Sequence, residues 1–184
     1  GGAEAGEVRR ADMDGERGRA GRGASAKERG VASVDALTGV YRRGAGFGEL
    51  GREIARSRGT RKPFALAFVD VDQLKGINDA RGHAAGDRML LEVANTLRAK
   101  LRNYDLIFRY GGDEFVCGLA GLNLADASIR MSRVNAALAD APEHGSVTVG
   151  VAELQADDSP ESRIERADAA PYRERDQQPT VHQG

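Results

Sequence analysis

Two groups of acidic residues adjoin short apolar segments and are the first candidates for chemistry. Asp70 and Asp72 lie at the end of the apolar segment 64–71, and Asp113 and Glu114 follow the two glycines of RYGGDEFVCGL, residues 109–119. Carboxylates that meet raise one another's pKa unless a cation neutralises them, and Mg²⁺ prefers such oxygen ligands. Such an ion, with phosphate oxygens completing its octahedron, serves phosphoryl and nucleotidyl transfer. For an Asp-Glu pair at a glycine turn alone, a solvated polar turn is the commoner interpretation.

The chain between these acids could bind a nucleotide. Residues 70–87, DVDQLKGINDARGHAAGD, include Lys75 for a phosphate, the Asn78 amide for a base or sugar, and Asp87 near a predicted helix start. Guanine presents two neighbouring donors, and one carboxylate such as Asp87 can accept from both. Taken singly, Asn78 and Asp87 are equally explained by turn chemistry and by a negative charge near a helix N-terminus.

The elements that must position these residues follow from the apolar pattern. The segment FALAFVDV, residues 64–71, is typical of a strand buried on both faces. The segments DLIFRY and EFVCGL flank the glycine pair and predict a hairpin, whose two-residue turn would use the positive φ that glycine supplies. Helical spacing and one more strand pattern complete the series: helices near 47–54, 90–101 and 127–138, and a strand at 146–154.

This order of elements predicts an α+β fold of the ferredoxin-like or polymerase-palm kind. Its central sheet is expected to be mostly antiparallel and flanked by helices, which we place on one face. The segment 70–87 is expected to be a glycine-rich loop. The segment 161–172, ESRIERADAAPY, starts like a helix that Pro171 is expected to interrupt.

The composition is that of one globular domain with tails. Residues 1–30 are dense in glycine, arginine and acids and are expected to be disordered, with a basic RNA-binding arm as the alternative. Residues 31–175 would form the domain, and residues 176–184 a second disordered tail. The formal net charge of −1 speaks against generic binding to nucleic acid or to anionic membranes.

Two further features favour the cytoplasm. No apolar run approaches the roughly 20 residues of a membrane span. The single cysteine, Cys117, suits a reducing compartment, and its simplest interpretation is a small buried hydrophobe.

The segment DVDQLKGINDARGHAAGD followed by RYGGDEF resembles the signature of the GGDEF family, the diguanylate cyclases. The resemblance extends from DALTGV at Asp35 to RADAAPY near Tyr172. It implies a nucleotidyl cyclase fold and a nucleotidyltransferase that joins two GTP molecules into cyclic di-GMP and releases pyrophosphate. It also implies a functional homodimer, because each domain would hold one GTP, and a dependence on Mg²⁺ or Mn²⁺.

The resemblance also implies roles for the acids. Asp70, the backbone carbonyl of Val71 and Asp113 would be the metal ligands, with Glu114 assisting at the catalytic centre. Asp113 would also accept the proton of the attacking hydroxyl.

Substrate contacts follow from the same resemblance. Asn78 and Asp87 would read the guanine, and His83 lies in the substrate loop of the family. Lys75 would approach the phosphates, and Arg175 falls where the family carries a lysine for the phosphates.

Two features qualify the expected activity. Arg102 and Asp105 fit the RxxD site at which the product inhibits members of the family, five residues before GGDEF. Taken alone, the pair could also be an arginine at a helix C-terminus followed by a strand-opening aspartate, but this register favours the inhibitory site. Pro171, and Pro179 at a second expected cation position, put GTP affinity in doubt. The alternatives are therefore a weak or inactive domain that binds cyclic di-GMP or GTP as a sensor, and a cyclase with relaxed base choice.

Overall fold

The structure is a computed structural model that describes residues 33–176, with side chains through residue 169. The predicted tails at 1–30 and 176–184 lie outside the described residues, apart from the backbone of Asp176. In the part of the chain so described, no helix has the length and apolar character needed to cross a membrane.

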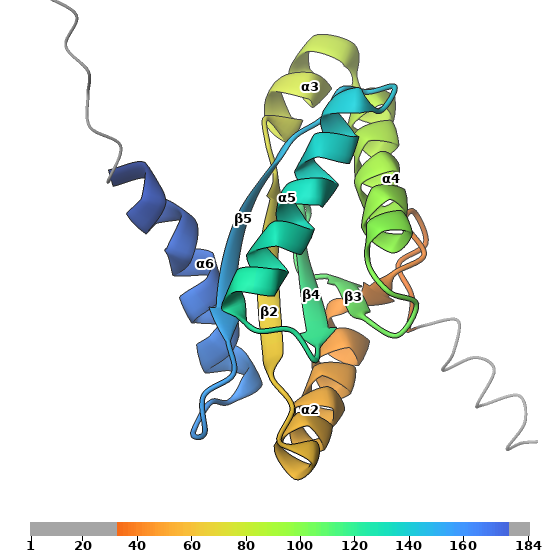
Figure 1. Cartoon of the computed structure of the whole chain (residues 1–184). Helices are drawn as coiled ribbons and strands as arrows, with labels where there is room; N and C mark the ends of the chain where they lie inside the picture. Colours follow the sequence, from red (N-terminus) through yellow and green to blue (C-terminus); the bar gives the residue numbers. More distant parts are fainter. Residues whose placement is uncertain (1–32, 177–184) are drawn as a thin grey trace, which may run out of the picture. The chain divides into compact units, whose positions relative to one another are not determined.

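The strands form one five-stranded sheet in the order β1-β3-β4-β2-β5 (Figure 1). They are β1 (Tyr41–Arg42), β2 (Phe64–Val71), β3 (Leu106–Arg109), β4 (Glu114–Ala120) and β5 (Val147–Glu153). Only β1 and β3 run parallel, whereas β3, β4, β2 and β5 pair antiparallel. The predicted α+β fold with a mostly antiparallel sheet is confirmed.

Helices cover both faces of this sheet, so the expectation of helices on one face is wrong. The helices are α2 (Arg43–Thr60), α3 (Leu74–Arg81), α4 (His83–Lys100), α5 (Leu124–Asp140) and α6 (Pro160–Asp176). One apolar core joins the sheet to α4 and α5, and the other joins its opposite face to α2 and α6 (Figure 1). Alternate residues of β2 enter the two cores, Phe64 and Leu66 on one side and Ala65 and Ala67 on the other. The near-continuous apolar run of β2 requires cover on both faces.

The expected loop at 70–87 is mostly helical. After a short turn, α3 and α4 follow with Gly82 between them, which adopts a φ of 84°. Leu74 is buried in the core and Ile77, three residues on, packs against its edge. That i, i+3 spacing gives α3 an apolar anchor, which its glycine and polar residues obscured.

The backbone of α6 continues past Pro171 to Asp176, contrary to the predicted interruption. A proline inside a helix lacks one backbone donor and crowds the carbonyl four residues earlier, but the other bonds of the helix can persist around it. Arg175 lies on this last part of α6, beyond the residues whose side chains are described.

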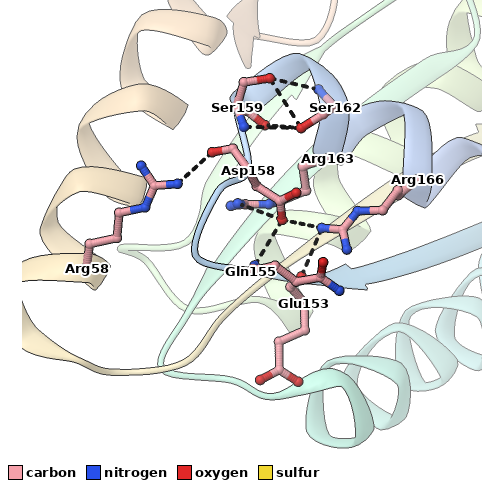
Figure 2. A network of polar contacts seen from close by, with 8 residues as sticks. All are labelled: Arg58, Glu153, Gln155, Asp158, Ser159, Ser162, Arg163 and Arg166. Atoms are coloured by element: carbon pink, nitrogen blue, oxygen red, sulfur yellow. Dashed lines mark hydrogen bonds and ion pairs between the residues drawn. The ribbon is translucent and has the colours of Figure 1, made fainter.

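A polar network fixes the start of α6 (Figure 2). The carboxylate of Asp158 accepts hydrogen bonds from the backbone N–H of Gln155 at 2.9 Å, from Arg163 at 3.2 Å and from Arg166. Its carbonyl accepts one from Arg58 of α2 at 2.7 Å. The Asp158 carboxylate thus joins the loop before α6 to α6 itself. The Asp158 backbone carbonyl joins the same loop to α2.

Arg163 is the least expected member of this network. Its side chain has no exposed surface, and its guanidinium carbon lies 5.9 Å from the centre of the Phe64 ring. Nε and Nη1 have no partner within the described residues. Burial lowers the pKa of Arg163, and repulsion from Arg166 and Arg58 adds to this against the attraction of Asp158. Arginine side chains are usually exposed, so the position of Arg163 in the sequence does not predict its burial.

Candidate functional site

The antiparallel pairing of β2 and β4 brings the acidic residues to one end of the sheet. Asp70 of β2 stands opposite Glu114, the first residue of β4. The backbone N–H of Val71 donates to the carbonyl of Asp113 at 2.9 Å, which holds the residue before β4 against the end of β2. Acids that are more than 40 positions apart along the chain therefore lie on adjacent strands.

The glycines of the hairpin have a different role from the predicted one. Its last strand pair is Arg109 with Phe115, and the N–H groups of Tyr110 and Gly111 both donate to the carbonyl of Glu114. The connection between β3 and β4 is formed by residues 110–113 and is longer than the predicted two-residue turn. Neither glycine is among the described residues with positive φ.

Gly111 instead provides room for a carboxylate. A Cβ atom at this position would lie 2.2 Å from Oε2 of Glu114. Any larger residue would push the Glu114 side chain away. A Cβ atom on Gly112 would meet nothing within 4 Å, so the tip of the hairpin is open.

The surroundings of Glu114 disfavour its charge. Burial raises the pKa of Glu114, and the negative charges of Asp113, Asp70 and Asp168 raise it further against the opposing charge of Arg43. Asp168 belongs to α6 and Arg43 to the start of α2. Neither residue was predicted for the site, because both approach it only through the packing of α2 and α6.

This pKa shift has a measurable consequence for stability. The folded protein binds the Glu114 proton more tightly than the unfolded chain, so the resulting stability is present at low pH and is lost as pH rises through the folded-state pKa. Glu114→Gln is therefore expected to raise the melting temperature at about pH 8, and to change it little at about pH 3.5, where both states are protonated. Glu165→Gln, on the exposed face of α6, is the control. A Glu114→Gln effect that is equal at both pH values would contradict this electrostatic account.

Arg109 fixes the hairpin loop from the side. Its guanidinium donates to the carbonyls of Gly111 at 3.2 Å and Gly112 at 2.6 Å, and Nη1 lies 3.2 Å from both carboxylate oxygens of Asp35. Asp35 also accepts from the N–H and hydroxyl of Thr38. Burial alone would raise the pKa of Asp35, but the bonds from Thr38 and the charge of Arg109 outweigh it and lower that pKa. The backbone N–H of Gly39 donates to the carbonyl of Asp35 at 2.8 Å, so the turn that these residues form helps to hold the hairpin.

Tyr110 and Arg43 form a second support. The guanidinium carbon of Arg43 lies 4.2 Å from the centre of the Tyr110 ring, and Nη2 donates to the Tyr110 hydroxyl at 3.2 Å. The same ring meets Phe68 of β2 edge to face at 5.4 Å. A cation on an aromatic face is thus held close to the acids.

The predicted nucleotide-binding residues lie on α3 and α4. Lys75, His83 and Asp87 are exposed, and Asn78 is half-buried. A Cβ atom on Gly86 would lie 1.9 Å from Oδ1 of Asn78, so the two helices touch at this point. Oδ1 of Asn78 is buried and has no hydrogen-bond partner within the described residues.

Asp72 does not join the acidic group. Its two carboxylate oxygens each accept one hydroxyl, from Ser146 and from Thr148, both at 2.6 Å. Its backbone N–H donates to the carbonyl of Ser146 at 3.0 Å. Asp72 therefore ties the turn after β2 to the start of β5.

The donor set fits a hard cation with an incomplete protein shell. Within the described residues, no three side chains of His, Cys, Asp or Glu gather closely enough to hold a metal ion by themselves. A cation near Asp70 and Asp113 would need the Val71 carbonyl, water or ligand oxygens as well. Mg²⁺ typically binds in this way, through one or two carboxylates and phosphate oxygens.

Arg102 and Asp105 border a separate groove. Its volume is about 490 Å³, and Tyr41, Arg98 and Asn103 contribute to its lining. Asp105 is 9% exposed, and its Oδ2 accepts from the backbone N–H of Arg102 at 2.8 Å, while Oδ1 has no described hydrogen-bond partner. Burial raises the pKa of Asp105 despite this bond.

The guanidinium of Arg102 is hydrogen-bonded to residues other than Asp105. It bonds to the Tyr104 hydroxyl and reaches the carbonyl of Ala120 at 3.4 Å. Asp105 thus stabilises the turn before β3, and the two residues share a groove without a side-chain bond between them.

Comparisons with known proteins agree on one family. Residues 32–180 match the family described as "Diguanylate cyclase, GGDEF domain". The diguanylate cyclase DgcP of Pseudomonas aeruginosa is 38% identical over 153 residues, which cover 79% of this chain and 23% of DgcP. The chain thus spans about a quarter of the length of that relative.

Solved structures show the same fold. The structure of the coiled coil and GGDEF domain of DgcB from Caulobacter crescentus, in complex with c-di-GMP, matches with a TM-score of 0.76 and 27% identity. It covers 84% of this chain and 86% of that one. Diguanylate cyclase SiaD of Pseudomonas aeruginosa, in complex with its activator SiaC, matches with a TM-score of 0.73 and 31% identity over 86% of this chain and 64% of that chain.

Proposed function

Since the chain belongs to the GGDEF family of diguanylate cyclase domains, we propose that it condenses two molecules of GTP into cyclic di-GMP and pyrophosphate. The observation that carries this proposal is the register of β2 and β4, which sets Asp70 opposite Glu114 with Asp113 hydrogen-bonded to Val71. This acidic end of the sheet adjoins the open tip of the hairpin at Gly112. GTP as the substrate would place the reaction in the cytoplasm.

The reaction is a nucleotidyl transfer. The 3′-hydroxyl oxygen of one GTP attacks the α-phosphorus of the other, the bond from that phosphorus to pyrophosphate breaks, and the hydroxyl proton passes to Asp113. A second, symmetric transfer closes the ring. The residues that would hold Mg²⁺ or Mn²⁺ are Asp70, the Val71 carbonyl and Asp113, with Glu114 assisting. The bound ion would neutralise phosphate charge and lower the pKa of the attacking hydroxyl.

The remaining predicted residues would bind the substrate. Asp87 would accept hydrogen bonds from the guanine N–H groups, and the Asn78 amide would donate to or accept from the base. The buried Oδ1 of Asn78 has no hydrogen-bond partner among the described residues. Lys75 and Arg175 would neutralise phosphate charge, and His83 would border the substrate at the start of α4. Only Arg175 lacks a described side chain.

Product binding is a second part of the proposal. Arg102 and Asp105 line the groove of about 490 Å³, which could take a guanine base of cyclic di-GMP. An arginine can donate two bonds to guanine O6 and N7, and a carboxylate can accept from the guanine N–H groups. Arg102 would have to leave Tyr104 for this contact. Cyclic di-GMP would then inhibit the domain from outside the acidic site, and a domain without turnover would still act as a sensor of this nucleotide.

The concentration dependence of turnover tests the need for two copies. Each domain would hold one GTP, so two acidic sites must face each other, and association supplies the proximity of the reacting groups. Cyclic di-GMP formed per unit of protein is expected to rise with protein concentration until the dimer is saturated. A flat specific activity across a wide dilution series would contradict reaction between two transiently associated domains.

A further inference from the structure

Glu143 bridges the two helices that carry the proposed guanine-binding residues. It lies in the loop between α5 and β5, which runs beside α3 and α4 in Figure 1. Arg81, the last residue of α3, donates to Oε2 of Glu143 at 3.3 Å. Arg88 of α4 donates through Nε to Oε1 at 3.2 Å. One carboxylate therefore holds both sides of the turn at Gly82.

The loop holds Glu143 in a fixed place. The backbone N–H of Glu143 donates to both carboxylate oxygens of Glu92, at 3.2 and 3.1 Å. A Cβ atom on Gly145 would lie 2.5 Å from the sulfur of Met89, so the loop lies directly on α4. The Glu143 side chain is only 15% exposed, although both arginines are about half exposed.

The helix α3 has few other anchors. Among its eight residues, Leu74 alone is buried, at the start of the helix. Its C-terminal end meets α4 through Asn78 and Gly86, where there is no space for a Cβ atom. A small rotation of α3 about Gly82 would therefore move Asn78 relative to Asp87. The bridge through Glu143 opposes that rotation.

We infer that Glu143 is a positioning residue for guanine recognition, because it fixes the angle between α3 and α4 through Arg81 and Arg88. This inference rests on the proposed function, in which Asn78 and Asp87 bind the base. Glu143 would touch no substrate. Its removal should disturb selection of the base more than the chemistry at Asp113.

The test compares the binding of two nucleotides whose bases differ by one hydrogen-bond donor group. Inosine lacks the exocyclic amine of guanine, so a correctly placed Asp87 favours guanosine. Calorimetry on the full chain would use guanosine and inosine triphosphates with a methylene group between the α- and β-phosphates, which cannot release pyrophosphate. Glu143→Gln is expected to weaken binding of the guanosine analogue about tenfold and that of the inosine analogue much less. Glu143→Asp, which retains the charge, should restore part of the preference.

The same titrations on a second variant serve as the control. Glu49→Gln removes a carboxylate that bonds Arg52 on α2, and should leave both affinities unchanged. If Glu143→Gln keeps the wild-type preference for the guanosine over the inosine analogue, this inference fails but the proposed function stands. The same holds if Glu143→Gln weakens the binding of both analogues equally and lowers the melting temperature. A wild-type chain that binds neither analogue would overturn the proposed function and this inference with it.

Discussion

Replacing Asp113 by asparagine is expected to reduce cyclic di-GMP formation by about 10³-fold, with no loss of unfolding free energy. The asparagine amide is nearly the same size, but it cannot accept the hydroxyl proton and is a weak metal ligand. Its neutral side chain also removes one of the charges that raise the pKa of Glu114. The measurement is pyrophosphate release from saturating GTP and Mg²⁺, together with urea unfolding of the same sample.

Asp157→Asn serves as the matched control for this change. Asp157 is an exposed aspartate in the loop after β5, so both activity and stability should match those of the wild type. An Asp113→Asn variant that keeps more than about a tenth of wild-type turnover would show that this carboxylate is not the proton acceptor.

The largest effect on stability is expected at Asp158. Asp158→Ala leaves the fully buried Arg163 without its carboxylate, and breaking a buried ion pair in this way costs about 3–5 kcal/mol of unfolding free energy. The further change Arg163→Met should recover most of this loss, because an apolar side chain beside Phe64 has no charge to desolvate. Urea unfolding of Asp158→Ala, Arg163→Met and the double variant measures both the loss of unfolding free energy and its recovery.

An exposed ion pair gives the comparison. Glu49→Ala removes the partner of Arg52, whose side chain is 70% exposed, and should cost less than about 1 kcal/mol. A double variant as unstable as Asp158→Ala would mean that Asp158 acts through Gln155 and the loop backbone, and that the buried charge contributes little.

The strands β2 to β5 were predictable from the sequence because their signals are local, whereas the two-residue strand β1 (Tyr41–Arg42) was not predicted. The unbroken apolar run of β2 indicates burial on both faces, and the β4 segment after the glycine pair predicts the hairpin. A strand that is buried on both faces requires cover on both faces of the sheet. The order of elements alone had led us to expect helices on one face only. The helix α3 was missed because its apolar contact with the core depends on Leu74 and Ile77 alone.

The acidic residues were predictable as candidates, but their supports were not. Arg109 is adjacent to the glycine turn in sequence, yet its clamp depends on Asp35, which is 74 positions away. Asp168 and Arg43 approach Glu114 from α6 and α2. An apolar period predicts which residues of a helix are buried, but not which of its polar residues lie near the acids. Arg163 is an exception to the rule that charged residues of a helix face the solvent, because its side chain is buried beside the Phe64 ring.

The stoichiometry of products from the wild-type chain tests the central claim most directly. With GTP and Mg²⁺ alone, two pyrophosphates are expected for each cyclic di-GMP, since each of two GTP molecules loses one. ATP under the same conditions should give neither product. Pyrophosphate without cyclic di-GMP, a cyclic mononucleotide formed from one GTP, or a folded protein that releases no pyrophosphate at high concentration would contradict the proposed reaction.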